Sequence, residues 1–136
     1  MEAKVLEKHF RVPIVKFDSP NSNGRTYSSE ILPKLQKLCD DKRFCGIPAE
    51  TSFRGRDIPL EKTGAIVESL EVIDNIVYAD ILLLETPSGF ILQELRRTGE
   101  LAARLFGIGN IDEAGKISNF EPLGISVGLE KDVAVL

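Results

Sequence analysis

The most informative part of this chain is the segment Asn21-Ser22-Asn23-Gly24-Arg25-Thr26-Tyr27. Its asparagines, serine and glycine supply the backbone angles of tight turns, and Gly24 permits a left-handed conformation at low cost. We expect Arg25 and Tyr27 to hold this turn against the body of the protein by hydrogen bonds and stacking. The segment, which we call the NSNGRTY segment, therefore predicts a structural junction.

The sequence on either side of this segment predicts a strand region followed by a helix. Residues 3–17 are rich in β-favouring side chains, and Pro13 restricts that region to a sheet edge or a bulge. Ser28 or Ser29 is expected to cap a helix over residues 28–41. The side chains spaced to form its apolar face are Ile31, Leu35 and Leu38.

The middle of the chain predicts a loop and then a β-hairpin. Residues 46–62 hold two prolines and two glycines with little periodicity, so we expect an irregular loop that contacts a partner. Residues 64–73 and 76–84 alternate apolar and polar side chains around Asp74-Asn75, which predicts two strands joined by a tight turn.

The last third predicts a second helix and two more strands. Thr86 is a favourable N-cap, and Pro87 suits the first helical position of a helix over residues 87–98. Its expected apolar face includes Phe90, Ile91 and Leu95, and Gly99 is expected to end it in a left-handed conformation. The turn residues 112–115 separate strands over residues 101–109 and 116–129.

The element order predicts one α+β domain spanning residues 1–136. We expect a mostly antiparallel, curved sheet or small β-barrel flanked by two or three helices. The formal net charge is −4, and the basic pairs Arg54-Gly55-Arg56 and Arg96-Arg97 are best explained as exposed surface. Direct nucleic-acid binding is therefore not expected, because it requires a dense basic face.

Cysteine and histidine content argues against a metal site. Cys39 and Cys45 are the only cysteines and His9 is the only histidine, whereas zinc sites generally need four nitrogen or sulfur ligands. No run of eighteen apolar residues appears, so we expect no membrane span. We also expect no cofactor. We expect synthesis in a host cytoplasm and two free thiols.

Several motifs in order resemble those of the tailed-phage prohead proteases, serine proteases that trim capsid scaffolds and are similar to the herpesvirus assembly protease. The resemblance begins at the NSNGRTY segment and covers residues about 10–128. The other matching segments are Gly64-Ala65-Ile66, Val77-Tyr78-Ala79, Thr86-Pro87-Ser88-Gly89, Gly107-Ile108-Gly109 and residues 117–123. The resemblance implies a prohead-protease-like fold.

The same resemblance indicates that the catalytic side chains are missing. The family has a catalytic histidine before a proline in a glycine-rich loop, and here Gly46-Ile47-Pro48 places Ile47 at that position. The family's serine-bearing strand aligns through Gly107-Ile108-Gly109, which places Arg104-Leu105 at the nucleophile. Because a serine nucleophile needs a neighbouring base, we expect no catalytic residues.

One alternative restores a catalytic pair. Gly124-Ile125-Ser126-Val127-Gly128 resembles the nucleophile strand of another branch of these proteases, so Ser126 would be the nucleophile and His9 the base. The carboxylate pairs Asp57 with Glu61 and Asp112 with Glu113 are better explained by solubility and turn formation.

The function implied by this resemblance is structural. We expect a non-catalytic protein of a tailed-phage virion, namely a cement or decoration component of the head. Its partners would be the major capsid protein, other virion proteins and further copies of itself. The alternatives are an active maturation protease that uses Ser126 and a neck, connector or tail component.

Overall fold

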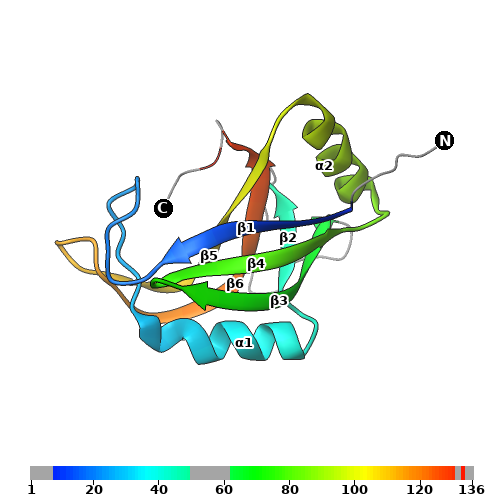
Figure 1. The fold of residues 1–136 in the computed structure, drawn as a ribbon. Coiled ribbons are helices and arrows are strands. Elements are labelled where there is room, and N and C mark those ends of the chain that lie inside the picture. Colours follow the sequence, from blue (N-terminus) through cyan, green and yellow to red (C-terminus); the bar gives the residue numbers. More distant parts are fainter. Residues whose placement is uncertain (1–7, 50–61, 131–132, 134–136) are drawn as a thin grey trace.

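The computed structural model describes residues 8–49, 62–130 and 133. Their main feature is a curled six-stranded sheet, and two α-helices pack against it at different places (Figure 1). The strands are β1 (His9–Lys16), β2 (Cys45–Pro48), β3 (Ala65–Ile73), β4 (Ile76–Leu83), β5 (Leu101–Ile111) and β6 (Ile117–Leu129). The helices are the short 3-10 turn η1 (Ser29–Ile31), α1 (Leu32–Asp40) and α2 (Pro87–Thr98).

The sheet is mixed, with strand order β1-β4-β3-β2-β6-β5. Only β2 and β6 run parallel, and all other neighbouring strands are antiparallel. The sheet curls so that its two terminal strands, β1 and β5, approach each other and form a half-barrel. This arrangement confirms the predicted α+β class with a mostly antiparallel, curved sheet.

Most of the predicted strands are present. β1 lies at the sheet edge, and its register shifts between Pro13 and Val15, as expected from the proline. The β3–β4 hairpin turns at Asp74 and Asn75, whose φ angles of 52° and 67° are those of a tight hairpin turn. One register shift in β5 falls between Phe106 and Gly107, where a β-carbon would lie 2.2 Å from a backbone oxygen.

The prediction of an irregular loop over residues 46–62 is wrong for its first residues. Cys45–Pro48 forms β2, which pairs with β3 on one side and β6 on the other. Local sequence gave no strand signal because Gly46 and Pro48 are both poor strand formers. The strand exists because its neighbours supply the pairing: Ala49 N–H donates to the Val127 carbonyl at 2.8 Å. Residues 50–61 lie outside the described residues.

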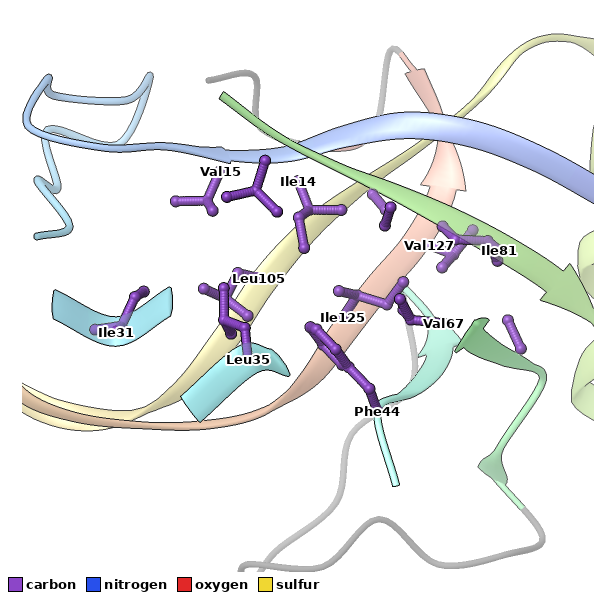
Figure 2. Close-up of a cluster of buried hydrophobic side chains, with 14 of the residues drawn as sticks. Ile14, Val15, Ile31, Leu35, Phe44, Val67, Ile81, Leu105, Ile125 and Val127 are labelled. Carbon is purple, nitrogen blue, oxygen red and sulfur yellow. The ribbon is translucent and has the colours of Figure 1, made fainter. Parts of the chain in front are cut away.

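The hydrophobic core fills the concave side of the half-barrel. Leu35 of α1 reaches Phe44 and Ile125 there, and each of these three side chains is fully buried (Figure 2). Burial of one such side chain contributes about 1.5–3 kcal/mol. The alternating residues Val77, Ala79, Ile81 and Leu83 point from β4 into the same core, as the hairpin pattern predicted.

The N-terminal caps of the helices follow the sequence, but the buried face of α2 does not. Ser28 caps η1, and the Thr86 hydroxyl accepts from Gly89 N–H at 3.0 Å. The predicted apolar face of α2 is wrong for Phe90 and Ile91, which are about half exposed. The α2 residues that are buried are Ser88, Gly89 and Leu92.

Close backbone packing explains this orientation of α2. A β-carbon on Gly89 would lie 1.9 Å from the Leu84 carbonyl oxygen, so the helix rests on the end of β4 through its glycine. The predicted left-handed cap at Gly99 is also wrong. Gly99 has a φ of 179°, an extended conformation that leads directly into β5.

The NSNGRTY segment joins three parts of the chain. The Asn21 side-chain oxygen accepts from the backbone N–H groups of Asn23 and Arg25 at 2.9 and 3.0 Å, which fixes the turn. Thr26 N–H then donates to the Gly115 carbonyl, and Ile117 N–H donates to the Thr26 carbonyl, both at 2.9 Å. The segment therefore ties the end of β1 to the β5–β6 turn.

Tyr27 anchors this junction in the core. Its ring meets Phe120 edge to face, with centroids 5.1 Å apart, and its backbone bridges to Phe17. The stacking role predicted for Tyr27 is therefore confirmed. The expected clamp by Arg25 is not found, because its guanidinium makes no hydrogen bond within the described part of the chain.

A glycine substitution tests the junction. Gly115 has a φ of +85°, and a β-carbon there would lie 2.0 Å from the Gly24 carbonyl oxygen. Gly115→Ala should lower the free energy of unfolding by about 2–4 kcal/mol, measured by denaturant titration. Gly24→Ala is the matched control, since Gly24 also has a positive φ but open space around it, and should cost about 1 kcal/mol. Equal costs would contradict the junction.

Candidate functional site

Three positions singled out from the sequence lie side by side in the sheet. Ile47 of β2 is opposite Ser126 of β6, and Ser126 is opposite Arg104 of β5. These are the position expected to hold a histidine, the alternative nucleophile, and the position expected to hold a serine. We call them the Ile47–Ser126–Arg104 row.

All three members of this row point to the convex face of the sheet. Ser126 lies between Ile125 and Val127, which are core residues, and side chains alternate across a strand. Arg104 lies in the same way between Ala103 and Leu105, so Leu105 belongs to the core and not to the row.

Ile47 reaches this face for the same reason. Its neighbour Gly46 faces the core, where a β-carbon would lie 3.2 Å from side chains of Ala65, Ile125 and Val127. Ile47 therefore points away from the core, although it is buried, with 3% of its surface exposed.

The row offers no proton acceptor to Ser126. The serine is 8% exposed, and its hydroxyl makes no hydrogen bond within residues 8–49, 62–130 and 133. On one side stands the hydrocarbon side chain of Ile47. On the other side Ser126 pairs with Arg104, whose guanidinium stays protonated and has no acceptor atom. These two neighbours cannot take the hydroxyl proton.

His9 and Ser126 are not brought together. In the sheet order β4, β3 and β2 lie between β1 and β6, so His9 and Ser126 are on strands that do not pair. The His9 imidazole is largely exposed, and its Nε2 lies 3.3 Å from Glu68 Oε1. The geometry therefore gives Ser126 no histidine.

Among the other carboxylates considered from the sequence, Asp112 has a structural role. The Asp112 carboxylate accepts from the backbone N–H groups of Ala114 and Lys116 at 2.9 Å each, which fixes the β5–β6 turn. Asp57 and Glu61 lie outside the described residues. Among those described, no cluster of three or more His, Cys, Asp or Glu side chains is arranged to hold a metal ion, and no helix is long and apolar enough to cross a membrane.

An ion-pair ladder crosses the convex face of β1, β4 and β3. Arg11 donates to both Asp80 oxygens, at 2.8 and 2.9 Å, and also to Glu71. The Ser69 hydroxyl donates to Asp80 at 2.7 Å. The Arg11 guanidinium, followed by Ser69, lowers the pKa of Asp80, so this carboxylate is held ionised and is unsuited to donate a proton.

Both cysteines are free thiols of low reactivity. Burial raises the pKa of both Cys39 and Cys45. A hydrogen bond with Thr63 lowers the pKa of Cys45, but this effect is smaller than that of burial. The protonated thiol is a poor nucleophile, so burial disfavours a nucleophilic role for either side chain.

A cavity of about 250 Å³ lies at the open mouth of the half-barrel, where the NSNGRTY segment meets β5 and β6. Its charged lining residues are Lys16, Arg25 and Arg104, and no Asp or Glu lines it. Burial raises the pKa of Tyr27, while the charges of Arg25 and Arg104 act in the opposite direction, and all three residues line the cavity. Sequence reasoning missed this cavity because its residues are far apart in the chain.

Comparison with known proteins gives one informative likeness. No protein-family model matches the chain, and no curated protein matches it significantly. Among solved structures, the chain is similar to the capsid assembly protease gp21 of bacteriophage T4, with a TM-score of 0.69 and 19% sequence identity. The alignment covers 88% of this chain and 79% of the protease chain. At this identity the likeness shows a shared fold, as the motifs in the sequence implied.

The packing of Ile47 can be tested by truncation. Ile47→Ala should lower the free energy of unfolding by about 2–4 kcal/mol, because the buried side chain leaves a cavity. Ile108→Ala is the matched control in β5, where the side chain is 42% exposed, and should cost less than about 1 kcal/mol. Denaturant titration measures both. If Ile47→Ala cost no more than the control, the apolar side chain would have no packing role at this position.

Proposed function

We propose that this chain is a non-catalytic structural protein of a tailed-phage particle, a cement or decoration component of the head. It uses the fold of a capsid assembly protease to bind other proteins. Its partners are the major capsid protein and further copies of itself. The observation that supports this proposal most is the composition of the Ile47–Ser126–Arg104 row.

The shared fold and the chemistry of this row together support the proposal. The structural neighbour is a capsid assembly protease, which associates the fold with phage capsids. In the motif alignment, the family's histidine corresponds to Ile47 and its serine to Arg104 or Leu105. The sheet brings Ile47 and Arg104 to either side of Ser126. Two positions predicted from separate segments thus meet at one place. That place lacks a base, and acyl transfer from serine needs one.

The alternative of an active protease that uses Ser126 has weaker support. Ser126 lies between the two aligned positions, but the His9 imidazole contacts the Glu68 carboxylate on another part of the sheet. A serine without a base is a poor nucleophile at neutral pH.

A cleavage assay tests the absence of hydrolysis. The purified protein and its Ser126→Ala variant are incubated with candidate scaffold and capsid proteins, and the products are followed by gel and mass spectrometry. We expect no fragments from either, because no base activates the serine. Fragments that appear with the unmodified protein and disappear with Ser126→Ala would show a protease.

Copy number separates a shell component from a neck, connector or tail component. Quantitative mass spectrometry of purified particles should find the chain in copies on the order of hundreds, because a shell repeats one contact over its whole symmetric surface. A count of about six or twelve would match a single ring and would contradict the head-shell proposal.

A further inference from the structure

We propose that the cavity at the mouth of the half-barrel binds a carboxylate-bearing, extended peptide segment of a partner protein. The site consists of Lys16, Arg25 and Arg104 around an apolar floor. Its lining comes from the end of β1, the NSNGRTY segment, β5 and the start of β6, and it shares Arg104 with the Ile47–Ser126–Arg104 row. The inference goes beyond the proposed function, since it holds whether or not the partner belongs to a virion.

The charge of the cavity lining favours an anionic ligand. The chain as a whole carries a formal charge of −4, yet three cationic side chains and no carboxylate line this cavity. None of the three makes an ion pair within the described part of the chain. Elsewhere on the described surface, cations such as Arg11, Lys37 and Arg97 are paired with carboxylates. An unpaired cation cluster in an acidic protein is complementary to an anionic ligand.

Size and polarity select a carboxylate on a peptide. A cavity of about 250 Å³ is smaller than the usual range for small-molecule sites, roughly 300–1,000 Å³, and fits a side chain. Its floor is hydrophobic, with Ile14, Leu105 and Phe120 all in the core cluster. The Tyr27 phenol adds a neutral donor beside the guanidinium groups. Such a mixture suits a short acidic side chain whose peptide also has apolar residues.

The position of the cavity supplies the argument for an extended segment. β5 is a terminal strand, and the cavity runs along it from Arg104 to Ile111. Gly107 and Gly109 contribute no side chains to the lining along this edge. The exposed Ile108 and Ile111 flank the same edge. A peptide that adds to this edge as a strand would place alternate side chains in the cavity.

The test uses the full-length protein and four fluorescent probes. The first is an end-capped peptide of alternating valine and glutamate, and the second is its glutamine counterpart. The third is the glutamine peptide with a free C-terminal carboxylate, which separates a terminal from a side-chain carboxylate. The fourth is a short single-stranded DNA. Fluorescence anisotropy gives the affinities, and amide chemical shifts of the labelled protein give the location.

Two variants assign the binding to the cavity. Arg25→Gln with Arg104→Gln removes two cations that line it, and Lys42→Gln with Arg43→Gln removes two exposed cations that do not. We expect the glutamate peptide to bind, and the cavity variant to bind it at least about tenfold more weakly, since each charged hydrogen bond contributes about 1.5–3 kcal/mol. The control variant should change affinity by less than about twofold.

The remaining outcomes are decisive as well. Tighter binding of the free-carboxylate peptide than of its capped form supports the site and assigns a chain terminus as its ligand. Equal binding of the capped glutamate and glutamine peptides, absence of binding by every peptide, or a preference for DNA would each overturn the proposal. If the cavity variant does not fold, the shifts in the unmodified protein decide: changes at Tyr27 and Gly107 support the site, and changes confined to α2 overturn it.

Discussion

The fold depends on the insertion of one short strand between two antiparallel units. β1, β4 and β3 form one unit, β6 and β5 form the other, and only the four residues of β2 connect them in the sheet. The fit is tight, because a β-carbon on Gly46 would lie 3.2 Å from side chains on both neighbouring strands. Glycine at this position lets the core of the two units become continuous, with Phe44 and Ile125 packed on the same side (Figure 2).

The same insertion determines which residues meet on the convex face. Because β2 runs parallel to β6, Ile47 comes to lie beside Ser126, and β5 brings Arg104 to the other side. The concave face of these strands holds the hydrophobic core, whereas Arg104 on their convex face is exposed. A scaffold of this kind can keep its shape while its chemistry changes, which is why the fold alone does not fix the activity.

The sequence predicted the parts of the fold that depend on neighbouring residues. The Asp74-Asn75 turn and the Thr86 cap follow from local backbone chemistry, and both are present. β2 was missed because a four-residue strand with a glycine and a proline is stabilised only by partners distant in the chain. The buried face of α2 was missed because close contact at Gly89, rather than the periodicity of larger side chains, orients the helix.

The sequence allowed the residues of the candidate site to be predicted, but not how they are arranged in space. The resemblance to prohead proteases identified Ile47 and Arg104, while their common row with Ser126 depends on strand pairing. The cavity at the mouth of the half-barrel gave no sequence signal beyond Arg25, since Lys16, Arg25 and Arg104 converge only when the sheet curls.

The central claim, that this protein keeps the fold of a capsid protease without an activated serine, can be tested most directly by intact-mass spectrometry. The purified protein is treated with a fluorophosphonate, which forms a stable adduct with activated serine hydroxyls. The account predicts an unchanged mass, because the row gives Ser126 no base. A single adduct that maps to Ser126 would contradict it.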